Sequence, residues 1–476
     1  MVRSHDPVAV AVANASLLGI GYWMLGRRTL AVVTELITVA LIALLAASAE
    51  TGTWFEIVVV LWWVTVIGHG WFLARRNAQR VTVRWQRLVA VAAAVPVLLV
   101  VGLLRYDAVS IGHTVADARQ GGDCPRAMTA LHRVWFGPRV ADAPLAARDD
   151  KTAEACHRLK TAQKELAAGS ASANGAALQA GVDGLTRVLA DYPGHAEMVQ
   201  TVLNDFLDGL PTTNPCRTAA ITDWLRQHRP SDGDLPRISG VVARTAPAAL
   251  VGCGDDLMAA KNWGAARTRY QQLVHEYPGQ HLVATARAGV KRATLAIELD
   301  NVRHLLADPV FLPDYCDHPA RYSGAPPYRK GLSRALFFAA DGGSDQNTLD
   351  YGGGAYTNHV PRQWQTKDVT HAALVICAGA EKDGAAVQSC PYENKRFPDF
   401  PTTVTFHKIA IPVRAYELRT GKLVVNTTVQ IGGASCPDHL RYSDSVELAD
   451  IGPPSHVYVN ASAADVRAAF QPVFVR

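Results

Sequence analysis

The sequence predicts a three-part protein: an α-helical membrane module of four spans, an all-α region of paired helices, and a small, mainly antiparallel α+β domain. Three observations carry this expectation. Four long apolar runs fill the first 105 residues, and Ala, Leu and charged residues recur at helical spacing up to about residue 312. Beyond that point β-branched and aromatic residues alternate at strand spacing. We therefore expect domains over residues 1–105, 106–312 and 313–476.

The apolar runs lie at about 8–25, 30–48, 54–73 and 88–104. A helix needs about 20 residues, with a range of about 17–25, to cross the hydrocarbon core of a bilayer, and all four runs fit that window. A buried soluble domain would need helices with polar faces, which these runs lack. The N-terminus also lacks the basic segment and cleavage site of a signal peptide. The sequence thus predicts four spans surrounded by lipid bilayer.

The arginine distribution predicts the orientation of these spans. Residues 1–105 carry nine Arg, no Lys and four acidic residues, whereas the rest of the chain is balanced at 38 basic and 38 acidic residues. That balance excludes the electrostatic footprint of a nucleic-acid partner. Two loops hold the arginines that set the topology: Arg27, Arg28, Arg75, Arg76, Arg80, Arg84 and Arg87. The positive-inside rule places both loops in the cytoplasm, so residues 106–476 and the N-terminus are expected outside it.

All eight cysteines follow residue 123, on the side expected to be extracytoplasmic. An even number of cysteines confined to one side indicates an oxidising compartment. In the helical region, one cysteine begins a helix and the next lies in the helix that would run antiparallel to it. We expect four disulfides that use all eight cysteines, with Cys124–Cys156 and Cys216–Cys253 in the helical region, Cys377–Cys390 across a hairpin, and Cys316 and Cys436 completing the set.

Two ionisable residues lie inside the apolar runs. Glu35 is seven residues past Arg28, and His69 is six residues before Arg75, so each lies about 10 Å inward from a cytoplasmic arginine cluster. The pair has two interpretations: a proton or ion relay, or a polar clasp between the second and third spans. A proton or ion pathway across the membrane would need more than one such pair, so the polar clasp is the favoured interpretation.

The segment from the first to the second run carries Gly19, Gly21, Tyr22, Gly26 and Arg27. It resembles the small bacterial two-helix transmembrane hairpins that have a G-x-G-Y…G-R turn. That resemblance implies a membrane module with no defined chemistry.

The helical region contains an internal repeat, because VLADYPG at 188–194 recurs as LVHEYPG at 273–279. In the second copy the preceding helix has one apolar stripe, formed by Trp263, Ala266, Tyr270, Leu273 and Val274. This W-G-x-A…Y…L…Y-P pattern resembles tetratricopeptide-like helical hairpins. The resemblance implies a curved stack whose concave face makes protein or peptide contacts; a generic helical bundle is the alternative.

The C-terminal region has a clear hairpin signal over 403–431, around the turn Thr420-Gly421-Lys422. Its C…C-x-Y…T-G-K…C-P arrangement resembles sheet domains of unknown function at the ends of bacterial surface proteins, which implies no activity. Asp341, Asp345, Asp350, His359 and His371 gather around a Gly-rich run. A hydrolytic or calcium-binding site formed by these residues is an alternative interpretation. The sequence motifs of a nucleophile elbow and of a phosphate loop are absent.

These observations favour a membrane-anchored extracytoplasmic binding or scaffold protein that mediates protein or peptide contacts in the cell envelope. We expect no catalysis, no cofactor and no metal. A sensor or transport accessory subunit acting through Glu35 and His69 is one alternative. A cell-envelope hydrolase using the C-terminal loops is the second.

Overall fold

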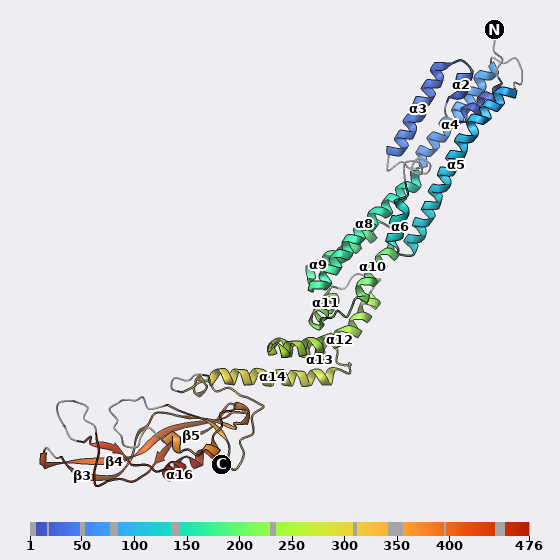
Figure 1. Cartoon of the computed structure of the whole chain (residues 1–476). Coiled ribbons are helices and arrows are strands. Elements are labelled where there is room, and N and C mark those ends of the chain that lie inside the picture. Colours follow the sequence, from blue (N-terminus) through green and yellow to red (C-terminus); the bar gives the residue numbers. More distant parts are fainter. Residues whose placement is uncertain are drawn as a thin grey trace. The chain divides into compact units, whose positions relative to one another are not determined.

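The computed structural model describes residues 6–16, 19–47, 53–76, 84–134, 143–228, 235–307, 312–340, 356–394, 397–442 and 453–475 (Figure 1). The chain divides into two compact units, Met1–Ala249 and Leu250–Arg476. This division falls inside the region expected to form one helical domain. Its physical reason is visible in the second unit, where the last long helix shares a hydrophobic core with the sheet.

The apolar part of the first unit comprises α1 (Pro7–Asn14), α2 (Ile20–Met24), α3 (Arg28–Ala47), α4 (Thr53–Arg76) and α5 (Arg84–Gln120). Two helices of the part that the structure describes, α5 and the Ile57–Arg76 portion of α4, are long and apolar enough to cross a membrane. The described residues therefore support two of the four expected spans and do not confirm a four-span module. The first apolar run is broken into two helices of 8 and 5 residues, and neither reaches across about 30 Å at 1.5 Å per residue.

The break between α1 and α2 has a local cause. Asp6 begins α1 by accepting a hydrogen bond from the backbone N–H of Val8 through its side chain, and Pro7 occupies the first helical position. Gly19 then begins α2 with a φ of 62°, in the left-handed region that favours glycine. The polar residues Asn14 and Ser16 between these points are buried, so the run folds back on itself.

The rest of the first unit is helical. Its elements are α6 (Cys124–Leu131), α8 (Ala143–Ser172), α9 (Gly175–Asp191), α10 (Ala196–Asp208), α11 (Pro215–Gln227) and the beginning of α12 (Leu235–Ala259). α8 and α9 form a helical hairpin, and Asn174 caps α9 by accepting from Ala176 N at 2.9 Å. The two helices approach closely because Gly181 faces Leu166; a Cβ at Gly181 would lie 2.6 Å from the leucine side chain.

The second unit begins with the end of α12, which is followed by another helical hairpin, α13 (Trp263–Glu276) and α14 (Val283–Leu305). Asn262 caps α13 through a hydrogen bond from Ala265 N. Tyr270 is fully buried, and its ring lies between two glycines, Gly254 of α12 and Gly289 of α14. The predicted apolar stripe of α13 is therefore the packing face of this hairpin. Membership of the tetratricopeptide-like class stays a prediction.

Within the described residues, the sheet of the second unit has six strands: β1 (Ala335–Ala339), β2 (Leu374–Ala378), β3 (Lys382–Asn394), β4 (Phe397–Glu417), β5 (Lys422–Ile431) and β6 (His456–Tyr458). The order is β1-β2-β4-β3, and β5 and β6 also pair with the long strand β4. The predicted hairpin is confirmed as β4–β5, with Glu417 opposite Lys422. β1 and β2 are parallel, as are β4 and β6, so the sheet is mixed.

Two cores enclose the sheet. On one face α16 (Ala463–Phe474) places Phe470 and Phe474 against sheet residues that include Ile411. On the other face, Val302 of α14 packs with Tyr315 and with the strand residues Val375 and Tyr416. α15 (Tyr356–His359) contacts α16 by stacking Tyr356 on Phe470.

Candidate functional site

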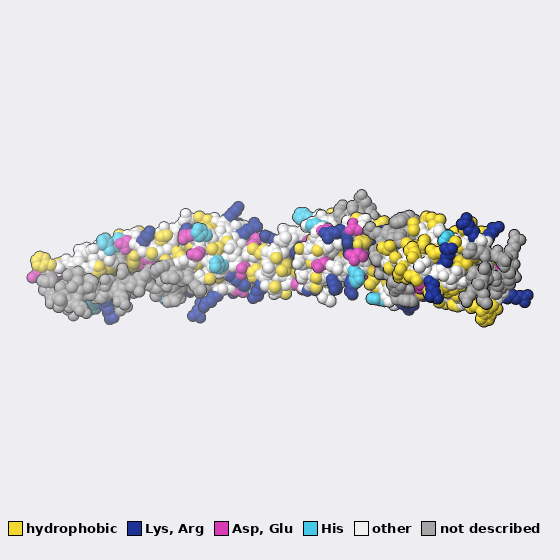
Figure 2. Space-filling model, turned by 90° about the horizontal axis from the view of Figure 1, so that it is seen from above, with side chains coloured by type: hydrophobic (Ala, Val, Ile, Leu, Met, Phe, Trp, Pro, Cys, Tyr) yellow, Lys and Arg dark blue, Asp and Glu magenta, His cyan; other side chains and the backbone are white. Residues whose placement is uncertain are grey.

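The apolar helices expose many large hydrophobic side chains. Figure 2 shows these side chains gathered on the part of the molecule that holds α3, α4 and α5. The exposed residues include Val32, Leu36, Val39 and Leu44 of α3, Ile57, Val60, Leu61 and Val64 of α4, and Leu98, Leu99, Val100, Val101 and Leu103 of α5. An apolar surface of this extent is not a water-facing surface; it marks contact with a membrane or a partner.

Arginines flank this surface at one end. The guanidinium of Arg75 lies 4.9 Å from the ring of Trp71, and that of Arg28 lies 5.9 Å from the ring of Trp23. Aromatic rings beside cationic groups are typical of the boundary between hydrocarbon and water. Arg27, Arg28, Arg75, Arg76, Arg84 and Arg87 are all described, whereas Arg80 lies outside the described residues.

The short helices α1 and α2 bind α4 through polar contacts. The Asn14 amide donates to the backbone oxygen of Val66 at 3.3 Å, and the Trp63 indole donates to the backbone oxygen of Ala15 at 3.0 Å. Tyr22 Oη lies 2.9 Å from His69 Nδ1. These contacts hold both arms of the α1–α2 hairpin against one face of α4. In an apolar setting each such bond satisfies a group that would otherwise be unpaired.

Two glycines make the space that Asn14 occupies. A Cβ at Gly21 would lie 2.4 Å from Asn14 Oδ1, and a Cβ at Gly70 would lie 2.1 Å from Asn14 Nδ2. Asn14 is fully buried, and its Oδ1 has no hydrogen-bond partner. The G-x-G-Y motif thus has a physical role here: Gly19 permits the turn, Gly21 admits the amide, and Tyr22 reaches His69.

The structure does not bring the two intramembrane candidates together. His69 bonds Tyr22, and Glu35 is exposed on α3. Among the hydrogen bonds and ion pairs of the described residues, none joins Glu35 to His69. The reason is that α2 places Tyr22 in one buried cluster with Ala31 of α3 and Val66 of α4. Sequence reasoning missed Asn14 and named Tyr22 only as part of the G-x-G-Y motif, without its contact to His69. Both are polar groups within the first apolar run.

An ion pair ties the start of α1 to the start of α5. Asp6 Oδ2 accepts from Arg87 Nε at 2.5 Å, and Asp6 is only 2% exposed. The backbone N–H of Asp6 also donates to the side-chain oxygen of Gln86 at 3.1 Å. The hairpin therefore begins beside the arginine-bearing start of α5 and ends at Arg27, just before α3.

The cysteines form disulfides, and both pairings in the second unit differ from expectation. Cys124 is bonded to Cys156, as expected, and the remaining helical cysteines Cys216 and Cys253 are also disulfide-bonded. The pairs in the second unit are Cys316–Cys377 and Cys390–Cys436. The predicted Cys377–Cys390 bond is wrong because β4 lies between the strands that carry these two residues. No cysteine is free.

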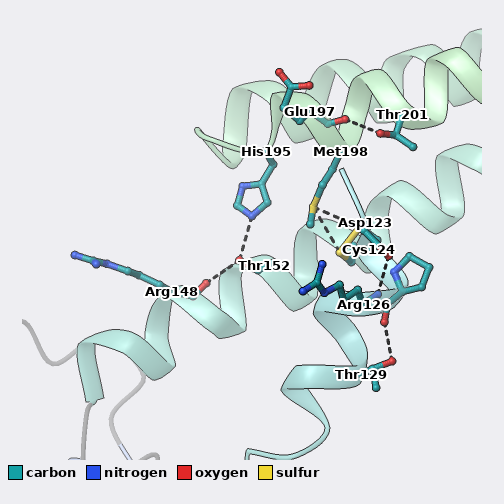
Figure 3. The surroundings of a disulfide bond; sticks show 12 residues. Asp123, Cys124, Arg126, Thr129, Arg148, Thr152, His195, Glu197, Met198 and Thr201 are labelled. Carbon is teal, nitrogen blue, oxygen red and sulfur yellow. Dashed lines mark hydrogen bonds between the residues drawn. A yellow bond between two sulfur atoms is a disulfide. The ribbon is translucent and has the colours of Figure 1, made fainter. Parts of the chain in front are cut away.

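The Cys124–Cys156 bond lies beside a buried histidine (Figure 3). Met198 of α10 points at the disulfide, with its sulfur 3.5 Å from Cys124 Sγ. On the same side, His195 Nε2 lies 3.2 Å from Thr152 Oγ1, and His195 Nδ1 lies 3.1 Å from the backbone oxygen of Tyr192. His195 is 4% exposed, and this burial lowers the pKa of its imidazole.

The candidate hydrolytic cluster is only partly described. Asp341, Asp345 and Asp350 lie outside the described residues, while His359 is exposed on α15. His371 is exposed, and its Nδ1 lies 2.9 Å from Asp368 Oδ2, three residues away. These two histidines therefore make no shared site that the structure shows.

A hollow of about 900 Å³ lies beside β1 in the second unit. Its apolar lining includes Leu306, Leu336 and Phe338, and its polar lining includes Arg362 and Lys367. A hollow with an apolar lining and a few charged groups is the common form of a binding site. Both basic side chains are exposed, so they favour an anionic group.

Comparisons with known protein families, with curated proteins and with solved structures found no match to this chain. The class that its own features define is a helical protein with apolar membrane-type helices, disulfide-bonded helical hairpins and a C-terminal mixed sheet.

Proposed function

We propose that the chain is a membrane-anchored binding or scaffold protein whose residues 106–476 lie outside the cytoplasm. The observation that carries this proposal is α5 (Figure 1). α5 is one helix of 37 residues, about 55 Å long, whereas the hydrocarbon core is about 30 Å thick. Its first part exposes apolar side chains, and its last part packs Ile111 and Val115 against Ala130 of α6. The helix α5 thus has a lipid-facing part and a part that packs in the outer helical region.

The topology that fits these helices has three crossings and one re-entrant hairpin. α4 and α5 cross the bilayer, and we infer that α3, a helix of 20 residues, makes the third crossing. α1 and α2 enter and leave the bilayer on the arginine side. The Asp6–Arg87 ion pair supports this arrangement, and so does the position of Arg27 and Arg28 after α2. Re-entrant backbone is tolerated in a membrane where protein covers it, and Ala9, Val10 and Tyr22 are at most 2% exposed. The N-terminus would then be cytoplasmic.

Reporter fusions to the full chain test this topology. A reporter that fluoresces only in the cytoplasm is fused before Met1, and a phosphatase active only outside is fused after Arg476. Three crossings predict that both fusions are active. An exported N-terminal reporter would refute the re-entrant hairpin and restore an even number of spans. An inactive C-terminal phosphatase, with the chain present in membranes, would refute the extracytoplasmic location itself.

The proposed partner is a protein or peptide with an anionic segment, bound outside the cytoplasm. The helical hairpin α13–α14 of the second unit supports a contact surface of the tetratricopeptide kind. The hairpin α8–α9 of the first unit separately supports another. The hollow beside β1 supplies apolar lining and the basic pair Arg362 and Lys367. Neither feature needs catalysis or a cofactor.

Affinity capture from membranes with the full chain tests the partner. The variant Arg362→Glu with Lys367→Glu reverses both charges at the hollow. The matched control, Arg419→Glu with Lys422→Glu, reverses two exposed charges at the turn end of the β4–β5 hairpin. A partner retained by the wild type and by the control, but lost by the hollow variant, supports the proposal. Equal retention by all three chains would remove the hollow as the binding surface.

A second candidate function, a sensor or transport accessory subunit, is favoured by one observation. The Tyr22–His69 bond and the unpaired Asn14 Oδ1 put polar groups inside the apolar helices, where such groups are costly and commonly functional. Tyr22→Phe should leave the membrane location unchanged. A loss of partner binding in that variant would move the function from the outer domain into the membrane helices.

A further inference from the structure

We propose that His407 and His456 bind a divalent transition-metal ion of tetragonal geometry, Cu²⁺ or Ni²⁺. The two histidines lie on neighbouring strands of the second unit, β4 and β6. These strands pair in parallel, with Thr405 opposite His456 and His407 opposite Tyr458. Register partners and residues two apart share one face of a sheet, so both imidazoles lie on the same face.

The hydrogen bonding of His407 directs a lone pair at His456. His407 Nδ1 lies 3.0 Å from the backbone oxygen of Gly384. A carbonyl oxygen only accepts, so Nδ1 carries the proton and Nε2 holds the lone pair in the neutral ring. A backbone carbonyl on the far nitrogen is the arrangement that orients metal-bound histidines in proteins.

The spacing of the two facing nitrogens fits a metal ion. His407 Nε2 and His456 Nδ1 are 2.9 Å apart. Two imidazole nitrogens bound at about 2.0–2.1 Å are about 2.9 Å apart at a right angle and about 3.3 Å apart at the tetrahedral angle. Adjacent positions of a square-planar or octahedral ion therefore match better than those of tetrahedral Zn²⁺. Without metal the same spacing is a hydrogen bond in which His456 is the donor. Binding therefore selects the other neutral tautomer of His456, in which Nε2 carries the proton and the Nδ1 lone pair faces the ion.

The backbone holds both ligands in place before any ion binds. Val459 N donates to His407 O at 2.9 Å, and Thr405 N donates to Ser455 O at 2.8 Å. His407 is half-buried and His456 is exposed, so an ion can approach from solvent. A fixed pair of ligands with an open side lowers the ordering cost of binding.

A neighbouring charge suits a cation. Asp383 of β3 lies opposite Ile409 of β4, two residues from His407. Its carboxylate favours a bound cation. In the part of the chain that the structure describes, no group of three or more His, Cys, Asp and Glu side chains is arranged to hold a metal ion. The protein therefore supplies two nitrogen ligands, and water completes the coordination.

The test is titration of the full chain in detergent with Cu²⁺ at pH 7.5, followed by electron paramagnetic resonance. The expected result is one high-affinity Cu²⁺ whose spectrum shows two nitrogen donors. His407→Gln and His456→Gln should each weaken binding by about tenfold or more, because each removes one donor. His371→Gln is the matched control, since His371 is also an exposed histidine of this unit. Its binding should equal that of the wild type.

Two results would overturn the proposal: equal Cu²⁺ affinity in the wild type and both glutamine variants, or equal loss in the control. Protection of His407 and His456 from diethylpyrocarbonate is measured in the wild type alone, so it does not depend on any variant folding. Stoichiometric Cu²⁺ should slow modification of both residues. Unchanged modification rates would show that no ion binds there. Neither readout involves a protein partner, so the scaffold function can fail while this site stands.

Discussion

Replacing Gly289 with alanine should destabilise the α13–α14 hairpin, although alanine is the better helix former. A Cβ at this position would lie 2.7 Å from Tyr270 Cδ1, and Gly254 also adjoins this ring, since a Cβ there would lie 2.4 Å from Cε1. Carbon atoms pack at about 3.5–4.0 Å, so an added Cβ overlaps a ring that is already closely surrounded. Such overpacking costs about 1–3 kcal/mol, and the gain from replacing a mid-helix glycine offsets about 0.5–1 kcal/mol of it.

The sign of the effect should reverse when the ring is removed. Tyr270→Ala by itself should cost about 3–5 kcal/mol, as truncation of a buried aromatic side chain does. In that background Gly289→Ala meets open space and should stabilise the hairpin by about 0.5–1 kcal/mol. The coupling energy of the cycle is then the overpacking cost, about 1–3 kcal/mol.

Hydrogen exchange of the full chain in detergent, followed by mass spectrometry on peptides from α13 and α14, measures these local stabilities. Gly264→Ala serves as the control, because a Cβ there would have no atom within 4 Å. The control should show no coupling to Tyr270→Ala. A Gly289→Ala effect of the same sign and size in both backgrounds would refute the packing argument.

Three other outcomes are expected. Peptide mapping without reduction should recover Cys316–Cys377 and Cys390–Cys436, and recovery of a Cys377–Cys390 peptide would contradict the sheet order. The pKa of His195 is lowered in the folded chain, so its contribution to folding stability is present above the unfolded pKa of about 6.5 and is lost as pH falls below that value. Between pH 7.5 and pH 5.5 the melting temperature should therefore fall less for His195→Gln than for the wild type. Equal falls would count against the buried, neutral histidine. Gly70→Ala should lower detergent stability, and Asn14→Ala should rescue it; a rescue that fails would mean that the amide is not what fills the space.

The sequence predicted what depends on local patterns. Apolar period, arginine position and turn residues located the apolar helices, the α13 packing face and the β4–β5 hairpin. It did not predict features that depend on which elements become neighbours. The first apolar run has the length of a span, but Gly19 and the buried polar group of Asn14 divide it into two short helices. The sequence did not predict this break, because Asn14 is accommodated only through its hydrogen bond to α4. In the same way, Tyr22 rather than Glu35 meets His69 because α2 folds against α4.

Because α5 is one continuous helix, a change in the tilt of its apolar half moves its other half as well. Helices bend sharply at residues such as proline, and Pro96 lies within the apolar half of α5. The part of α5 that follows Pro96 therefore keeps one direction, and the tilt that the bilayer sets extends to the end of the helix. A change in tilt of about 10° would displace a point about 25 Å beyond the hydrocarbon by about 4 Å. A displacement of that size exceeds what the close contact of Ile111 and Val115 with α6 can absorb by side-chain motion. Lipid thickness would therefore be transmitted directly to the disulfide-bonded helices.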